Sequence, residues 1–438
     1  MLGLVMTAGG ARGAYQAGVL KRIAEIPAFA DAPSPFAIIT GASAGAINGS
    51  VLAARSAHFA DAAEDVARVW SQLRVEQVIR ADAWSLLRTG LSLTSDFVLG
   101  SVFGHTVTHG LFDTTPLETM LRAVFPPKGI GESIQRGHLY AVAMTATSYH
   151  SGRSFTFIQG REGHPVWSKS RRVVLPVTLT HRHVLASAAI PIVFPPVQVS
   201  LREGDLWFGD GALRLVAPLS PAIRLGATRI LALGVRSKKS ADTLAQEEAG
   251  TACRIGGGGG GPELPCPPLA QICGVFMNAI FLDHLDADVE HLLRMNELLA
   301  DRPGFTSLVA TQEAGGKPLE PMKRIEPLVL SPSEDLALVA QRFVHRIPRL
   351  VRLVLDGLGF PDAQSADLTS YLLFDSTYTR TLVDIGYRDA SACIDELEHF
   401  LRTAPVLAPP SQQPKARRLW AVTSDRVAEG EDIEPGAM

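Results

Sequence analysis

The sequence predicts an α/β protein in which strands and helices alternate through glycine-containing turns. Residues 2–25 combine an apolar run, a glycine-rich loop and an amphipathic segment, which is the pattern of a strand, a loop and a helix. Residues 36–49 repeat this order with an apolar strand, a sharp turn and a helix of small residues. Residues 218–233 add a helix, a turn and a buried strand. Strands that alternate with helices are typical of an α/β architecture.

The composition favours a globular protein and excludes several classes of function. Of the 438 residues, 46% are hydrophobic and 19% are charged, and the formal net charge is −3. We therefore expect no nucleic-acid partner. The four cysteines lack metal-ligand spacing, so no metal site is predicted. No cofactor is expected either. With no signal-peptide pattern at its start and no apolar run of about 18 residues, the chain is expected to be cytoplasmic. Contact with a membrane surface stays open.

A G-x-S-x-G pentapeptide spans Gly41 to Gly45 and places Ser43 between the second predicted strand and its helix. This arrangement is typical of a nucleophile elbow, in which strained backbone angles expose a serine at a strand–helix turn. A tight turn without chemistry is the alternative, because the pattern is common by chance. The position directly after a strand favours Ser43 as a nucleophile.

The loop Gly9-Gly10-Ala11-Arg12-Gly13 places backbone N–H groups at the start of a helix, where negative charge is stabilised. A dinucleotide site is disfavoured, because Ala8 replaces the first glycine and the second strand ends without an acidic residue. A phosphate-binding P-loop is disfavoured because no lysine follows Gly13. The serine elbow in the next unit favours an oxyanion hole. A plain strand–helix turn is the alternative.

The predicted strand 206–209 runs into Asp210, which is followed by Gly211 and Ala212. Flanking glycines let the carboxylate project from a strand end, although Asp-Gly is also an ordinary turn pair. His181 and His183 are candidates for a catalytic histidine, against solvated or capping roles.

Four further segments leave alternatives open. The apolar stretch 84–99 reads as core, and alternatively as an acyl-chain pocket or a membrane contact. The insertion 237–268, with six consecutive glycines, is predicted to be a flexible loop, either inert or a lid. The acids of the predicted helix 269–299 indicate a solvated face rather than a metal site. Residues 154–158 alternate in polarity, which predicts an exposed or edge strand.

Together, four blocks in this order resemble those of the patatin-like phospholipase family. The segments 371–375 and 385–390 resemble the helical C-terminal part of its bacterial members. The resemblance covers residues 1–403. The four blocks are Gly9-Gly10-Ala11-Arg12-Gly13, Gly41-Ala42-Ser43-Ala44-Gly45, residues 187–196 and Asp210-Gly211-Ala212.

The resemblance implies a three-layer α/β/α sandwich with a mostly parallel central sheet and a helical C-terminal extension. It divides the chain into a catalytic domain at 1–330, the extension at 331–403 and a tail at 404–438, whose composition predicts disorder. One residue departs from the family pattern, because Ala8 stands where members usually carry a third glycine. Its methyl group is expected to crowd that edge of the loop.

For function, the resemblance implies a serine esterase with Ser43 as nucleophile, Asp210 as its partner and residues 9–13 as the oxyanion loop. The expected activity is lipid acyl hydrolysis of a phospholipid or another lipid ester. An acyltransferase and a catalytically silent lipid-binding protein are the alternatives. Arg12 is expected either to add positive charge for an oxyanion or a lipid phosphate, or to form a structural salt bridge. The sequence indicates no oligomeric state.

Overall fold

The computed structural model describes residues 1–80, 110–126, 128–167, 171–202, 204–237, 279, 284–301, 323–347, 352 and 366–402. The apolar stretch 84–99, the insertion 237–268 beyond its first residue, and the tail 404–438 lie outside the described residues. No helix in the described part of the chain is long and apolar enough to cross a membrane.

Within the described residues, nine strands form one sheet, whose main path runs β5-β4-β3-β2-β1-β8-β9. The contacts between β1, β2, β3, β8 and β9 are parallel, whereas β3 pairs with β4 and β7 in the antiparallel sense. The strands are β1 (Leu2–Met6), β2 (Ile38–Gly41), β3 (Ala141–Ser148), β4 (Ser154–Gly160), β5 (Arg172–Pro176), β6 (Val197–Leu201), β7 (Gly204–Asp210), β8 (Arg229–Leu233) and β9 (Glu326–Leu330). The mostly parallel central sheet expected from the sequence is thereby confirmed.

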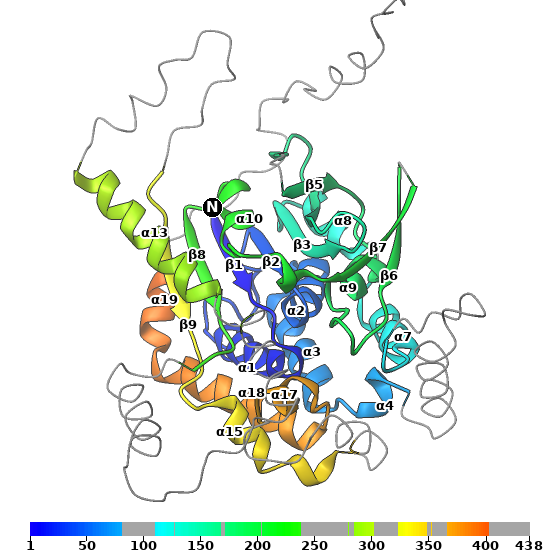
Figure 1. Ribbon diagram of the computed structural model, residues 1–438. Coiled ribbons are helices and arrows are strands. Elements are labelled where there is room, and N and C mark those ends of the chain that lie inside the picture. Colours follow the sequence, from blue (N-terminus) through cyan, green and yellow to red (C-terminus); the bar gives the residue numbers. More distant parts are fainter. Residues whose placement is uncertain are drawn as a thin grey trace, which may run out of the picture.

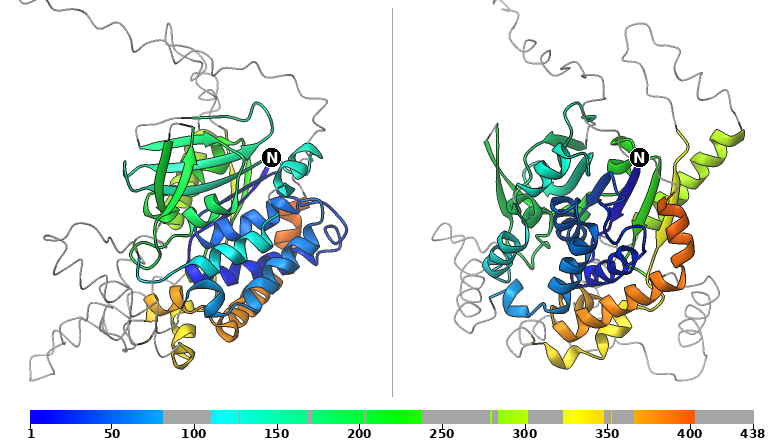
Figure 2. Two further views of the ribbon diagram at one scale, coloured as in Figure 1. Left: turned by 90° about the vertical axis from the view of Figure 1, so that its right-hand side faces the viewer. Right: turned by 180° about the vertical axis from the view of Figure 1, so that it is seen from behind.

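Helices cover both faces of this sheet, and the side chains of the strands alternate between the two cores. In β1, Leu4 and Met6 belong to the larger core, while Val5 belongs to the smaller one. This alternation follows from the two-residue period of a strand. It produces the three-layer α/β/α arrangement predicted for the chain, with α1, α2 and α3 beside the larger core (Figures 1 and 2). The smaller core lies against α10 and α13.

The helices that build these layers follow the strands closely in sequence. In the N-terminal half they are α1 (Gly13–Ala24), α2 (Ala44–Ala54), α3 (Phe59–Ser71), α4 (Val75–Val78), α7 (Thr115–Val124), α8 (Gly129–Gln135) and α9 (His181–Ser187). Further along the chain they are α10 (Ser220–Arg224), α13 (His284–Asp301), α15 (Leu336–Gln341), α17 (Ala366–Leu372), α18 (Ser376–Ala392) and α19 (Ile394–Arg402). Short 3-10 turns lie at Gly10–Arg12, Gly211–Leu213 and Val344–Arg346.

The C-terminal helices confirm the predicted helical extension. Figure 1 shows α15, α17 and α18, in yellow and orange, on the far side of α1 from the sheet. Gly18 in α1 faces the carbonyl of Val383, and Gly386 in α18 faces the carbonyl of Tyr15, each with no space for a side chain. The extension therefore packs directly on the helix that follows the glycine-rich loop.

The prediction of an exposed or edge strand at 154–158 is wrong. These residues belong to β4, which lies between β3 and β5 and is buried on both faces along Ser154–Ile158. One of the polar side chains that suggested exposure, Thr156, has a hydrogen-bond partner inside the sheet. The hydroxyls of Thr156 and Thr145 lie 3.4 Å apart across the β3–β4 pair. The alternating pattern therefore reflects paired hydroxyls and not a solvated face.

Candidate active site

The sheet register brings the ends of three strands together. Met6 at the end of β1 pairs with Gly41 at the end of β2, so the loop after Met6 lies beside the turn after Gly41. β3 extends beyond β2, and there β7 pairs with it, with Ala146 opposite Asp210. Because β7 runs antiparallel to β3, its last residue, Asp210, lies next to the turn that connects β2 with Ser43. The carboxyl ends of parallel strands are the usual place for a site in such a sheet.

Ser43 occupies a strained turn between β2 and α2. Its backbone angles are φ 54° and ψ −125°, a region that a residue with a side chain rarely adopts. A side chain on Gly41 would collide with the carbonyl of Gly45, and one on Gly45 would collide with the carbonyl of Met6. The two glycines therefore allow the tight turn, and the elbow geometry predicted for this pentapeptide is present.

The residues at the end of α9 hold the backbone of both Ser43 and Asp210. The N–H of Ser43 donates to the carbonyl and to Oγ of Ser187, each at 3.1 Å. The Ser187 hydroxyl in turn donates to the carbonyl of Thr145 at 2.5 Å. Two residues further along, the carbonyl of Ala189 accepts from the N–H of Asp210 at 2.8 Å. One short segment thus fixes both residues of the predicted pair.

The carboxyl group of Asp210 is fully buried beside Ser43. Its Oδ1 accepts from the N–H of Ala212 at 2.9 Å, and Gly211 packs against the carbonyl of Thr145 where no side chain would fit. Oδ2 has no partner of regular hydrogen-bond geometry. Burial raises the pKa of Asp210 to about 7, while hydrogen bonding from the Ser43 hydroxyl and from the N–H of Ala212 acts in the opposite direction. The two predicted residues therefore lie side by side, with a carboxyl group that changes its charge near neutral pH.

Some backbone N–H groups of the glycine-rich loop donate hydrogen bonds within the loop, and others do not. The N–H of Arg12 donates to the carbonyl of Gly9, and the N–H of Gly13 donates within the 3-10 turn. The N–H groups of Gly10 and Ala11 make no hydrogen bond among the described residues. Gly10 lines the same pocket as Ser43, whereas Ala8 lies with Ala42 and Ala212 around another, smaller cavity.

Arg12 is buried, and its guanidinium is directed toward the C-terminal extension. Its Nε donates to Oγ of Ser370 at 2.7 Å, and its Cζ lies 4.3 Å from the centre of the Tyr371 ring. A cation over an aromatic face is a stabilising contact. These contacts agree with a structural role for the side chain, the second of the two roles expected for it.

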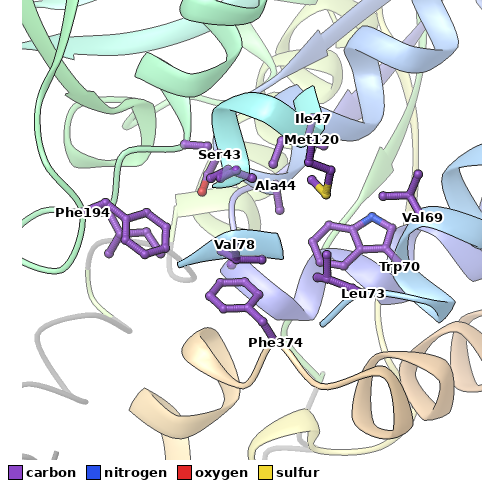
Figure 3. Close-up of a pocket in the computed structure, with 14 residues that line it drawn as sticks. Ser43, Ala44, Ile47, Val69, Trp70, Leu73, Val78, Met120, Phe194 and Phe374 are labelled. Atoms are coloured by element: carbon purple, nitrogen blue, oxygen red, sulfur yellow. The ribbon is translucent and has the colours of Figure 1, made fainter. Parts of the chain in front are cut away.

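An apolar pocket of about 460 Å³, including its part open to solvent, adjoins Ser43. Figure 3 shows Ser43 and Phe194 on one side, Trp70 on another and Phe374 pointing in from the C-terminal chain. Sequence reasoning did not identify this pocket, because its walls come from distant segments. Its lining residues are Gly10, Ser43, Ala44, Ile47, Val69, Trp70, Leu73, Val78, Leu117, Met120, Ala188, Ile190, Phe194 and Phe374.

The two candidate histidines lie outside this pocket. Nδ1 of His183 is bonded to the N–H and the hydroxyl of Thr180 at the start of α9, and burial lowers the pKa of His183 to about 4. The ring of His181 lies against Arg122 and Glu118. The capping role considered for these histidines thus applies to His183. Among the described residues, no group of acids, histidines and cysteines could hold a metal ion.

Fold and site together define an α/β protein with a serine at a strained strand–helix turn and a buried carboxyl group beside it. The family model of patatin-like phospholipases matches residues 4–223, about half of the 438 residues. The chain therefore belongs to the patatin-like phospholipase family. Comparison with curated protein sequences gives no match.

Comparison with solved structures gives matches of low sequence identity, among them the following two. VipD from Legionella pneumophila is 12% identical with a TM-score of 0.26, over 87% of this chain and 66% of VipD. Human GIVD cytosolic phospholipase A2 in complex with methyl gamma-linolenyl fluorophosphonate is 14% identical with a TM-score of 0.37, over 92% of this chain and 59% of that protein. The chain thus spans less than two thirds of either structure.

Proposed function

We propose that this protein is a lipid acyl hydrolase in which Ser43 is the nucleophile and Asp210 its base. The observation that carries the proposal is the contact between a strained, buried serine and a buried carboxyl group at the edge of an apolar pocket. A serine hydroxyl needs a neighbouring base to become a nucleophile. The raised pKa of Asp210 makes its carboxylate a stronger proton acceptor than an ordinary aspartate at neutral pH.

The reaction follows from the positions of these groups. Oγ of Ser43 attacks the carbonyl carbon of the ester while its proton passes to Asp210. The free N–H groups of Gly10 and Ala11 stabilise the charge on the carbonyl oxygen, and Gly9, Arg12 and Gly13 hold the shape of the loop. The tetrahedral intermediate then releases the alcohol, which takes the proton from Asp210. Water attacks the acyl-enzyme by the same route, and the fatty acid leaves.

The substrate class follows from the pocket. Its apolar lining suits a fatty acyl chain, whose transfer from water is favourable by about 0.8 kcal/mol for each buried methylene. We propose a phospholipid or another lipid ester as substrate, with contact to a membrane surface where such lipids are found. A cytoplasmic location, the absence of a nucleic-acid partner and the domain limits at residues 330 and 403 remain predictions.

The test compares the purified protein with its Ser43→Ala variant on a phospholipid, triacylglycerol and a short p-nitrophenyl ester. We expect release of fatty acid or nitrophenol by the wild type, and a loss of about a thousandfold or more in the variant. A serine-reactive fluorophosphonate should label the wild type at Ser43. Added glycerol or lysolipid distinguishes hydrolysis from acyl transfer by the products. A variant with wild-type turnover would contradict the role of Ser43.

A further inference from the structure

The C-terminal extension supplies one wall of the pocket beside Ser43. Phe374 lies two residues beyond the end of α17, and its buried ring lines the pocket together with residues of α2, α3 and α7. The ring stacks on that of Phe194, with centroids 6.3 Å apart and planes inclined by 27°. Figure 3 shows the two rings on adjacent sides of the space in front of Ser43. Phe374 lies far beyond residue 223, where the family model ends.

The position of this wall is fixed by the glycine-rich loop. Gly10, at φ 54°, approaches the backbone carbonyl of Tyr371 so closely that a side chain there would collide with it. Arg12 donates to Ser370 and lies over the Tyr371 ring. On the other side of Phe374, Asp375 caps α18 by accepting from the N–H groups of Thr377 and Tyr378. Phe374 is thus held between two anchored residues.

We propose that Phe374 determines which acyl chains this enzyme accepts, so that the C-terminal extension is part of the substrate site. The inference rests on the proposed function, since it assigns the acyl chain of the substrate to the pocket beside Ser43. When the ester carbonyl of the substrate lies at Ser43, its acyl chain can extend into the adjoining apolar pocket, where it is shielded from water. An aromatic ring in the wall contributes apolar contact to chains that are long enough to reach it. An acetyl group has a single carbon beyond the ester carbonyl, so it offers little apolar surface for such a contact.

The experiment measures kcat/KM for p-nitrophenyl acetate, octanoate and palmitate with the wild type and three variants of the full chain. Phe374→Ala should lower kcat/KM for octanoate and palmitate, relative to kcat/KM for acetate with the same variant, by about tenfold. Phe374→Trp should exclude palmitate most strongly, because the larger ring narrows the pocket. Phe400→Ala is the matched control, since Phe400 in α19 is similarly buried but lies outside the pocket lining.

The outcomes separate this inference from the proposed function. Equal ratios of palmitate to acetate turnover in the wild type and both Phe374 variants would overturn the role of Phe374. The acetate rate and the thermal melting of each variant show that it is folded, and Phe374→Trp keeps the test valid if Phe374→Ala is unstable. A wild type that cleaves no ester and is not labelled by a fluorophosphonate would instead contradict the proposed function.

Discussion

Asp210 is a residue whose position favours chemistry at the expense of stability. A carboxylate removed from water loses its solvation, and at Asp210 only Oδ1 has a regular hydrogen bond in return. Burial therefore raises the pKa of Asp210 to about 7. If Asp210 accepts the proton of Ser43, its ionised form is the active one. We expect kcat/KM to rise with pH through an apparent pKa of about 7 and then to level off.

The same pKa predicts a gain in stability when the charge is removed. A carboxyl with a raised pKa in the folded state is protonated there between about pH 4 and pH 7, whereas the unfolded chain is already ionised. Folding stability therefore falls as pH rises through this range. Asp210→Asn should abolish ester cleavage and raise the free energy of unfolding at pH 8 by roughly 2–4 kcal/mol.

Urea unfolding at pH 8 and at pH 4.5, by circular dichroism, checks this prediction for Asp210→Asn. The gain should shrink toward the lower pH, because the wild-type carboxyl is then protonated in the folded state. Asp205→Asn is the control, since Asp205 lies at an exposed position of β7. If Asp210→Asn and the wild type had the same free energy of unfolding at pH 8, burial of the ionised carboxylate would not destabilise the fold.

At the scale of single elements, the end of α9 has a role beyond packing. Ser187 connects the N–H of Ser43 with the carbonyl of Thr145, and Ala189 holds the N–H of Asp210. Pro191 has no N–H group that could donate to the carbonyl of Ser187 in a further helical turn. This carbonyl therefore accepts from the N–H of Ser43 instead. The end of this helix is thus explained by the local sequence. That its last residues would support both members of the predicted pair depends on contacts between distant segments.

The Ser187→Ala substitution is expected to lower kcat more than it changes KM. The variant loses the hydroxyl that accepts from Ser43 and donates to Thr145, so the strained turn is less well held. We expect kcat to fall by about tenfold, with KM of a short ester nearly unchanged. Stability should fall by roughly 1–2 kcal/mol. Steady-state kinetics with a short p-nitrophenyl ester and the rate of fluorophosphonate labelling measure the effect.

The control for Ser187 is Ser56→Ala. Ser56 is equally buried, and its hydroxyl also donates to backbone carbonyls, but these belong to the last turn of α2, which Ser56 follows in sequence. The two variants should lose similar stability, whereas only Ser187→Ala should lower kcat. If both variants kept wild-type kcat, Ser187 would be a structural residue without influence on the position of Ser43.

At the scale of the whole molecule, α1 connects the sheet to the C-terminal extension. Ten of its twelve residues are buried, including residues on the side away from the sheet. A helix that is buried all round needs partners on every side. The sheet provides one of these partners, and α18 provides another through its close crossing at Gly18 and Gly386. Residues 331–403 are therefore expected to be required for folding of the first 330 residues.

A chain that ends at residue 330 tests this expectation. It keeps every strand of the described sheet but lacks α15, α17, α18 and α19. We expect it to aggregate, or to unfold without a cooperative transition, because the outer face of α1 becomes exposed. A chain that ends at residue 403 is the control, and we expect it to melt like the full protein. A cooperatively folded chain of residues 1–330 would contradict the prediction.

The sequence by itself determined the local features of this protein. A glycine on either side of Ser43, the glycine-rich loop after β1 and the Asp-Gly pair after β7 were read correctly as turns, since these depend on the sterics of a few neighbouring residues. The alternation of strands and helices was predicted from the pattern of apolar residues, and the helical C-terminal region from the resemblance to the family. The order of the blocks was enough to indicate the family.

Only the tertiary structure decided how these features meet. That β7 pairs with β3 beyond β2, and so carries Asp210 to Ser43, depends on strand pairing across more than 60 residues of sequence. Long-range packing also decides that β4 lies inside the sheet and that Phe374 lines the pocket. The raised pKa of Asp210 likewise depends on its burial in the tertiary structure. Such contacts are made between residues distant in the chain, and no local pattern specifies which segments become neighbours.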